Sequence, residues 1–173
     1  MFVKQQTIYS SGDHGSPRMM KPILMIKPLL TLLLCSIAML SPQALAQERE
    51  MIMPVPASAY SQAVKTTGGV LVFLAGIGPT DEQGNLVAPG DFAGQIKQTW
   101  KNIDQAMAKA GGTLEDIVTM TVFTTERRWG ETFTHMRKDV FKKGYPSSAF
   151  MEAAKLLTPG AFIEIRAIAM VKQ

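Results

Sequence analysis

The sequence predicts an α+β domain, an α/β sandwich in which two helices cover one face of a mixed β-sheet. Apolar residues recur every three or four positions at 92–110 and 129–142, as on the inner face of a helix. Apolar and polar residues alternate at 117–124 and 162–170, as in strands. Crossovers between parallel strands are right-handed, so both helices should lie on the same face of the sheet.

The first 46 residues are predicted to be a secretory signal peptide. An apolar run at 25–40 follows Lys21, contains Lys27 and leads to small residues ending at Ala46, where cleavage is expected. Pro42 breaks the run before the about 20 apolar residues of a membrane-spanning helix. The expected location is therefore periplasmic or secreted, and an uncleaved N-terminal anchor is the alternative.

The segment before residue 25 is longer and more polar than a signal peptide needs. Translation from Met19, Met20 or Met25 therefore stays open. Cys35, the only cysteine, lies in the predicted signal, so the mature chain has no thiol and cannot form a disulfide.

Charge argues against nucleic acid as a partner. Removing residues 1–46 takes away four of the 18 basic residues and one of the 14 acidic residues, which leaves 14 basic and 13 acidic residues. Nucleic-acid binding normally needs a concentrated basic face. The remaining 127 residues fit one domain at 58–173, preceded by an extended lead-in at 47–57.

The first two predicted strands, 58–65 and 70–75, should form a hairpin. Gly68 and Gly69 lie between them and readily adopt the positive φ of a tight turn. Asp91 should then cap the first helix, which Gly111 ends. Its predicted inner face consists of Phe92, Ile96, Trp100, Ile103, Met107 and Ala110.

A capping turn from Thr113 to Asp116 should precede the strand at 117–124, whose residues Val118, Met120 and Val122 share one side. The second helix should end before Gly144 and Pro146. Its predicted inner face consists of Phe133, Met136, Val140 and Phe141.

One face of the sheet would be left uncovered in a single subunit. The last strand offers an apolar set for that face, Ile163, Ile165, Ala167 and Ala169. Exposed apolar patches of this kind mark interfaces, so we expect an oligomer in which sheets pack on sheets.

Four segments, 71–79, 116–123, 145–155 and 162–170, resemble the RidA (YjgF-like) family of reactive-intermediate deaminases. These are small trimeric enzymes that hydrolyse imines and enamines to carbonyl compounds and ammonia. The resemblance extends over 58–170 and implies a chorismate-mutase-like fold, a homotrimer and a small-molecule cleft between subunits.

Glu164 is the candidate catalytic residue, because it matches the family's glutamate that is thought to hold and activate a water. A shielded carboxylate has a raised pKa, which suits proton transfer near neutral pH. The alternative is a surface glutamate paired with Arg166 or a cross-strand lysine. A neighbouring Arg166 would also lower the pKa of Glu164 and weaken a general-base role.

Ser148 is the main departure from the family. Imine-hydrolysing relatives carry an arginine two residues after the proline, where its guanidinium holds the substrate carboxylate with two hydrogen bonds. This sequence has Ser148 after Pro146, which implies that no guanidinium clamps the ligand. Ser147 and Ser148 would instead donate single hydrogen bonds to a neutral or differently shaped ligand. Arg166 or Lys155 would replace the guanidinium if either side chain reached the cleft.

Four further positions should line the cleft by resemblance: Tyr60, Gly76, Ala149 and Phe150. Tyr60 would stack on a ligand or be an ordinary half-exposed strand residue. Ala75 and Ile77 replace more polar family residues, so the cleft should be more apolar than in relatives.

The sequence indicates neither a metal nor a cofactor. The mature chain has one histidine, His135, and no Gly-x-Ser-x-Gly motif, which argues against metal binding and a serine nucleophile. Two functions stay open: an imine or enamine deaminase, and a non-catalytic small-molecule-binding or chaperone-like protein.

Overall fold

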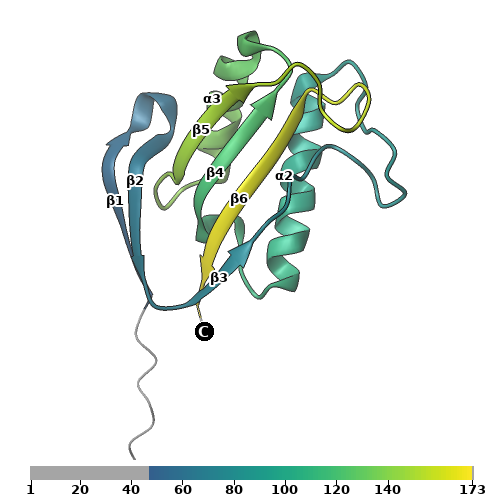
Figure 1. Cartoon of the computed structure of the whole chain (residues 1–173). Helices are drawn as coiled ribbons and strands as arrows, with labels where there is room; N and C mark the ends of the chain where they lie inside the picture. The colour runs from purple at the N-terminus through teal and green to yellow at the C-terminus, as the bar shows by residue number, and fades with distance from the viewer. Residues whose placement is uncertain (1–46, 173) are drawn as a thin grey trace, which may run out of the picture. The chain divides into compact units, whose positions relative to one another are not determined.

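The computed structural model describes residues 47–172, so the predicted signal peptide lies outside the described residues (Figure 1). Six strands form one mixed sheet in the order β1-β2-β5-β4-β6-β3. Both long helices lie behind this sheet in the view of Figure 1. The strands are β1 (Glu48–Val55), β2 (Tyr60–Thr67), β3 (Val70–Phe73), β4 (Ile117–Thr124), β5 (Ser147–Glu152) and β6 (Ile163–Val171). The helices are α2 (Phe92–Lys109) and α3 (Gly130–Val140), with short 3-10 helices η1 (Pro56–Ser58), η2 (Leu114–Asp116) and η3 (Arg127–Trp129).

The predicted α+β sandwich with two helices on one face of a mixed sheet is confirmed. β5 runs parallel to β2 and β4, whereas the β1–β2, β4–β6 and β3–β6 pairs are antiparallel. Within residues 47–172 no helix is long and apolar enough to span a bilayer.

The predicted hairpin between 58–65 and 70–75 is wrong. β2 pairs with β1 and β5, and β3 pairs with β6 at the far edge of the sheet. Gly68 and Gly69 do have positive φ angles, 71° and 89°, so the chain turns where expected. The turn sets where the chain reverses, but not which strands pair. The predicted lead-in supplies the missing partner, because residues 48–55 form β1.

The β1–β2 ribbon joins the rest of the sheet at one point. Its register to β5 consists of the single pair Ser61 and Ser147. The Ser61 N–H donates to Pro146 O at 3.0 Å, and its hydroxyl donates to Tyr145 O at 2.7 Å. This attachment holds Tyr60 beside the start of β5.

Helix α2 supplies much of the core, as predicted. The Asp91 side chain accepts a hydrogen bond from Gly94 N at 3.0 Å and caps the helix. Ala110 is the exception, because it is exposed at the C-cap. The other predicted inner residues are buried: Phe92, Ile96, Trp100, Ile103 and Met107.

Aromatic residues join the two helices. The Trp100 ring lies 6.1 Å from Phe133 and 5.7 Å from Phe141, centroid to centroid. Phe133 and Phe141 are buried as predicted, and Met136 and Val140 are half-buried. In the turn between α2 and β4, Thr113 N donates to Asp116 Oδ2 at 2.7 Å, which matches the predicted capping turn.

The face assigned to β6 is wrong. Ile163, Ile165, Ala167 and Ala169 are buried beneath the helices and belong to the core. Side chains alternate between the two faces along a strand. Because the apolar set packs on the helices, the other set lies on the uncovered side: Glu164, Arg166, Ile168 and Met170.

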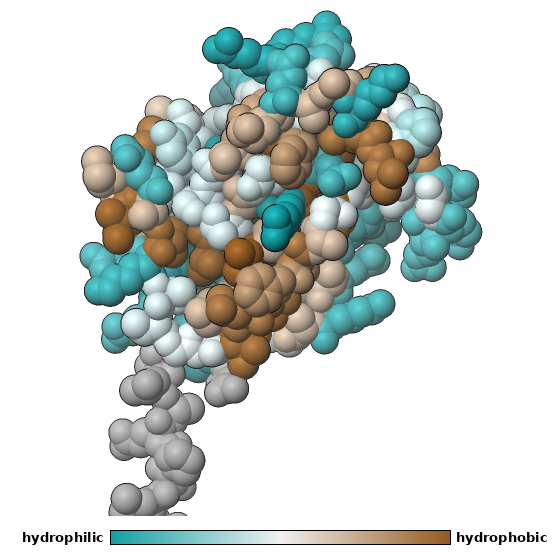
Figure 2. All heavy atoms as spheres, in the orientation of Figure 1, coloured by the Kyte–Doolittle hydropathy of each residue, from teal (hydrophilic) through white to brown (hydrophobic). Residues whose placement is uncertain are grey.

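We call this uncovered side the open face. By strand register it also carries Leu71 and Phe73 of β3 and Met151 of β5, which are 49%, 68% and 50% exposed. Figure 2 shows apolar surface gathered on this face, over the lower part of β3 and β6. The open face is therefore apolar, as expected, but through different residues.

Gln95 fixes the loop that leads into β6. Its buried side chain accepts a hydrogen bond from Phe162 N at 2.7 Å and donates to Gly160 O at 3.1 Å. We predict that Gln95→Leu lowers the free energy of unfolding by about 2–4 kcal/mol, because backbone polar groups lose their partners. Urea unfolding followed by circular dichroism measures this.

Gln105→Leu is the matched control, since Gln105 is an exposed residue of the same helix. It should change the free energy of unfolding by no more than about 0.5 kcal/mol. Equal effects of the two substitutions would contradict the assigned role of Gln95.

Candidate functional site

Glu164 lies on the open face, half-buried and directly against Gly76. A β-carbon at Gly76 would lie 2.2 Å from Oε1 of Glu164, so only glycine leaves room for this carboxylate. Ile77 fixes the approach: its N–H and carbonyl each form a 2.9 Å hydrogen bond with Ile165. The structure thus brings together two residues that the sequence places 88 positions apart.

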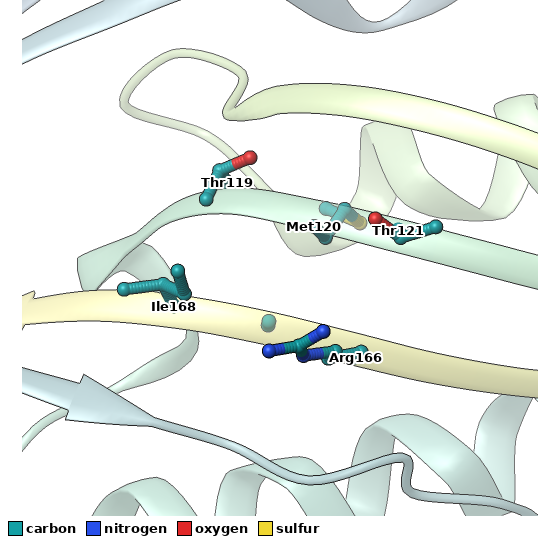
Figure 3. A pocket seen from close by; sticks show the side chains of 6 residues that line it. Thr119, Met120, Thr121, Arg166 and Ile168 are labelled. Carbon is teal, nitrogen blue, oxygen red and sulfur yellow. The ribbon is translucent and has the colours of Figure 1, made fainter.

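Arg166 does not pair with Glu164. No ion pair between them occurs among residues 47–172, and Arg166 faces Thr121 of β4 while Glu164 faces Phe123. A pocket of about 270 Å³ lies here, lined by Thr119, Met120, Thr121, Arg166, Ala167 and Ile168. Figure 3 shows the Arg166 side chain extending along β6 toward Ile168.

Ser148 and Phe150 lie on the other face of the sheet, beneath α3. The Phe150 and Phe133 ring centroids are 5.8 Å apart. The Ser148 hydroxyl accepts a 2.7 Å hydrogen bond from Nη1 of Arg137, a residue of α3. The strand itself carries no arginine at this position, but an arginine from the helix lies next to Ser148.

Arg137 is 95% buried, since its relative exposure is 5%. Nη2 donates to Ser58 O, and the guanidinium lies 5.1 Å from the Phe133 ring centroid. Burial lowers the pKa of Arg137 to about 10, and the nearby Tyr145 and Tyr60 act in the opposite direction. At neutral pH the side chain is a buried cation.

A pocket of about 350 Å³ opens beside this guanidinium, and we call it the helix-side pocket. Arg127 lies in η3, Gly130 is the first residue of α3, and both line the pocket. The other lining residues are Ser58, Tyr60, Thr134, Arg137, Ser148 and Phe150.

The predicted site residues thus form two groups within one chain. Tyr60, Ser148 and Phe150 line the helix-side pocket, whereas Glu164 and Gly76 meet on the open face. Ala149 also faces the open side, because it pairs with Thr121 between Ser148 and Phe150. A single chain does not bring Glu164 and Ser148 into one cleft.

Arg137 was missed by the sequence analysis. It lies four residues after Phe133 and four before Phe141, so the helical period places it on the same inner face as these two phenylalanines. The two other cations that were considered do not reach the pocket: Lys155 is exposed in the loop after β5, and Arg166 lies on the open face.

His135 is exposed on α3 and lies 3.7 Å from Glu131. Within residues 47–172 no group of three or more His, Cys, Asp and Glu side chains could hold a metal ion.

Comparisons with known proteins agree with this fold. The family model described as Endoribonuclease L-PSP matches residues 51–171. A RutC family protein of Pyrococcus abyssi is 30% identical over 116 residues, which cover 67% of this chain and 89% of that protein. A 3-aminoacrylate deaminase RutC of Acinetobacter baylyi is 29% identical over 120 residues, which cover 68% of this chain and 91% of that protein.

Two solved structures are also similar. The Rid-family protein YyfB of Yersinia pestis has a TM-score of 0.66 at 22% identity, covering 71% of this chain and 98% of that chain, and shows the fold alone. RidA of an Antarctic Psychrobacter has a TM-score of 0.55 at 29% identity, covering 68% and 93%. Taken with the family model and the curated relatives, these likenesses show that the chain belongs to the RidA (YjgF-like) family.

Proposed function

We propose that this protein is a deaminase that hydrolyses small imines or enamines to carbonyl compounds and ammonia. The observation that carries the proposal is the half-buried Glu164 carboxylate, for which Gly76 leaves room on the open face. A relative that is 29% identical bears the name 3-aminoacrylate deaminase, which supports an imine or enamine as the substrate class.

The proposed reaction needs only water and one proton acceptor. Glu164 accepts a proton from a bound water as the water oxygen attacks the imine carbon. Glu164 passes that proton to the imine nitrogen, which gives a carbinolamine with a hydroxyl and an amino group. Glu164 then accepts the hydroxyl proton and delivers it to the amino nitrogen, the carbon–nitrogen bond breaks, and ammonia leaves as the carbonyl forms.

We propose that the complete site lies between subunits of a homotrimer. Glu164 and the helix-side pocket lie on opposite faces of one sheet, so a second subunit is needed to place both beside one ligand. The apolar open face supports such an assembly, because a single subunit leaves Leu71, Phe73 and Met151 largely exposed to water. A protein that sediments as a monomer at micromolar concentration would contradict this.

Export is also part of the proposal, and it is supported by the signal-like sequence of residues 1–46. The mature protein should begin at Gln47. N-terminal sequencing of the protein from a periplasmic extract checks this. A protein in that extract that still contains residue 25 would refute cleavage.

The exposed apolar residues also favour a second candidate, a non-catalytic protein that binds small molecules or unfolded chains. The two candidates differ in turnover. The deaminase accelerates ammonia release beyond the rate in buffer, whereas the binding protein slows aggregation of an unfolded client without releasing ammonia.

Glu164→Gln tests the catalytic carboxylate. The amide has nearly the same shape but cannot accept the proton, so we predict that kcat falls about 10²- to 10⁴-fold. Ammonia release from an imino acid, generated in place by an amino-acid oxidase, measures the rate. Unchanged turnover in Glu164→Gln would exclude this residue as the proton acceptor.

Gly76→Ala tests whether the position of the carboxylate matters. The added β-carbon would come within 2.2 Å of Oε1, so Glu164 must move, and we predict a loss of kcat of about tenfold or more. Gly78→Ala is the control, because its β-carbon would meet only Ile163 O, at 3.7 Å. If both variants kept full activity, the carboxylate would not act from its observed place.

A further inference from the structure

We propose that the helix-side pocket binds the carboxylate of a small organic acid, and that Arg137 is the residue that recognises it. The inference that this pocket recognises a carboxylate does not depend on the proposed function. Only the identity of the natural substrate rests on that proposal. The pocket itself is inferred from the contacts of Arg137.

Arg137 is a cation without a counter-charge in the described part of the chain. It is 5% exposed, yet none of the ion pairs within residues 47–172 includes it. Its two protein partners, the Ser148 hydroxyl and Ser58 O, are both neutral. Burying an unpaired charge costs free energy and favours the neutral form, and the pKa of Arg137 is lowered for this reason.

The guanidinium also keeps an unused donor. Nε of Arg137 is buried and has no hydrogen-bond partner in the structure. Nη1 and Nη2 each make one bond to protein, although each carries two N–H groups. An edge of the guanidinium therefore remains for a ligand with two acceptor oxygens, which is the geometry that a carboxylate offers.

The pocket wall fits a small acid with an apolar body. Phe150 supplies an aromatic surface, and Tyr60 and Thr134, whose side chains carry hydroxyl groups, line the same pocket. No aspartate or glutamate lines this pocket, and Arg127 adds a second positive charge. An anion entering the pocket therefore meets no acidic lining residue.

Charge balance favours a monoanion. One carboxylate neutralises the one buried guanidinium, whereas a phosphate dianion would bring excess negative charge into a pocket whose second arginine, Arg127, is exposed. A volume of about 350 Å³ admits an acid of the size of butyrate or benzoate.

Acid and amide pairs test the proposal without any turnover. Calorimetric titration of the purified protein should show binding of butyrate or benzoate, and at least about tenfold weaker binding of butyramide and benzamide. Inorganic phosphate should bind more weakly than the acids. Equal binding of acids and amides, tighter binding of phosphate, or no binding of either acid would overturn the proposal.

Arg137→Met should remove acid binding while the protein stays folded, with a Tm equal to or above that of the parent, because an apolar side chain replaces a buried unpaired charge. Arg137→Lys should bind acids about tenfold more weakly, since an ammonium lacks the planar fork. Arg166→Met, on the open face, is the matched control and should bind like the parent protein. A folded Arg137→Met that still binds acids would overturn the assignment.

Thr134→Met keeps the test decisive if Arg137→Met does not fold. It fills part of the pocket and leaves the charge in place, so acid binding should weaken about tenfold. Unchanged acid binding in Thr134→Met would place the ligand elsewhere. Because all these readouts are equilibrium binding, loss of hydrolysis in Glu164→Gln and loss of binding in Arg137→Met are separate results.

Discussion

Side chains of successive strand residues point to opposite faces of a sheet, and in this domain helices cover only one of those faces. This constraint decides where every candidate residue lies. Glu164 shares β6 with a buried apolar set and is therefore left on the open face. Ser148 lies two strands away and points beneath α3. The two chemical groups that an imine hydrolase needs, a proton acceptor and an anchor for the substrate, are thus separated by the sheet of their own chain.

Helix α3 supplies what β5 lacks. The small side chain at position 148 leaves space for a guanidinium that arrives from the helix, and the Ser148 hydroxyl accepts its hydrogen bond. The arginine is held by packing on Phe133 and by the η1 backbone at Ser58. A cation that is buried before any ligand arrives loses little further hydration on binding an acid, which is a form of preorganisation.

Periodicity predicted which residues share a face but not which face is covered. The positions of Phe92 to Met107 predicted the inner side of α2, because a polar side and an apolar side are clearly distinct there. In β6 the alternating set was found but placed on the wrong side, since both sets contain isoleucine and only the packing of α2 and α3 decides between them. Gly68 and Gly69 predicted where the chain turns, but not which strands pair on either side of the turn. That pairing depends on contacts between residues far apart in the sequence. Arg137 was overlooked because a charged residue on an inner helical face is uncommon, although its spacing from Phe133 and Phe141 was visible.

Subunit mixing tests the account most directly. Glu164→Gln and Arg137→Met would each be inactive alone, and the two variants would be co-expressed with different tags and purified through both. If one subunit supplies Glu164 and its neighbour supplies Arg137, every mixed trimer that carries both tags has one intact site out of three, so the purified fraction should show about a third of the parental ammonia release. Mixed oligomers that stay as inactive as either parent variant would contradict a site shared between subunits.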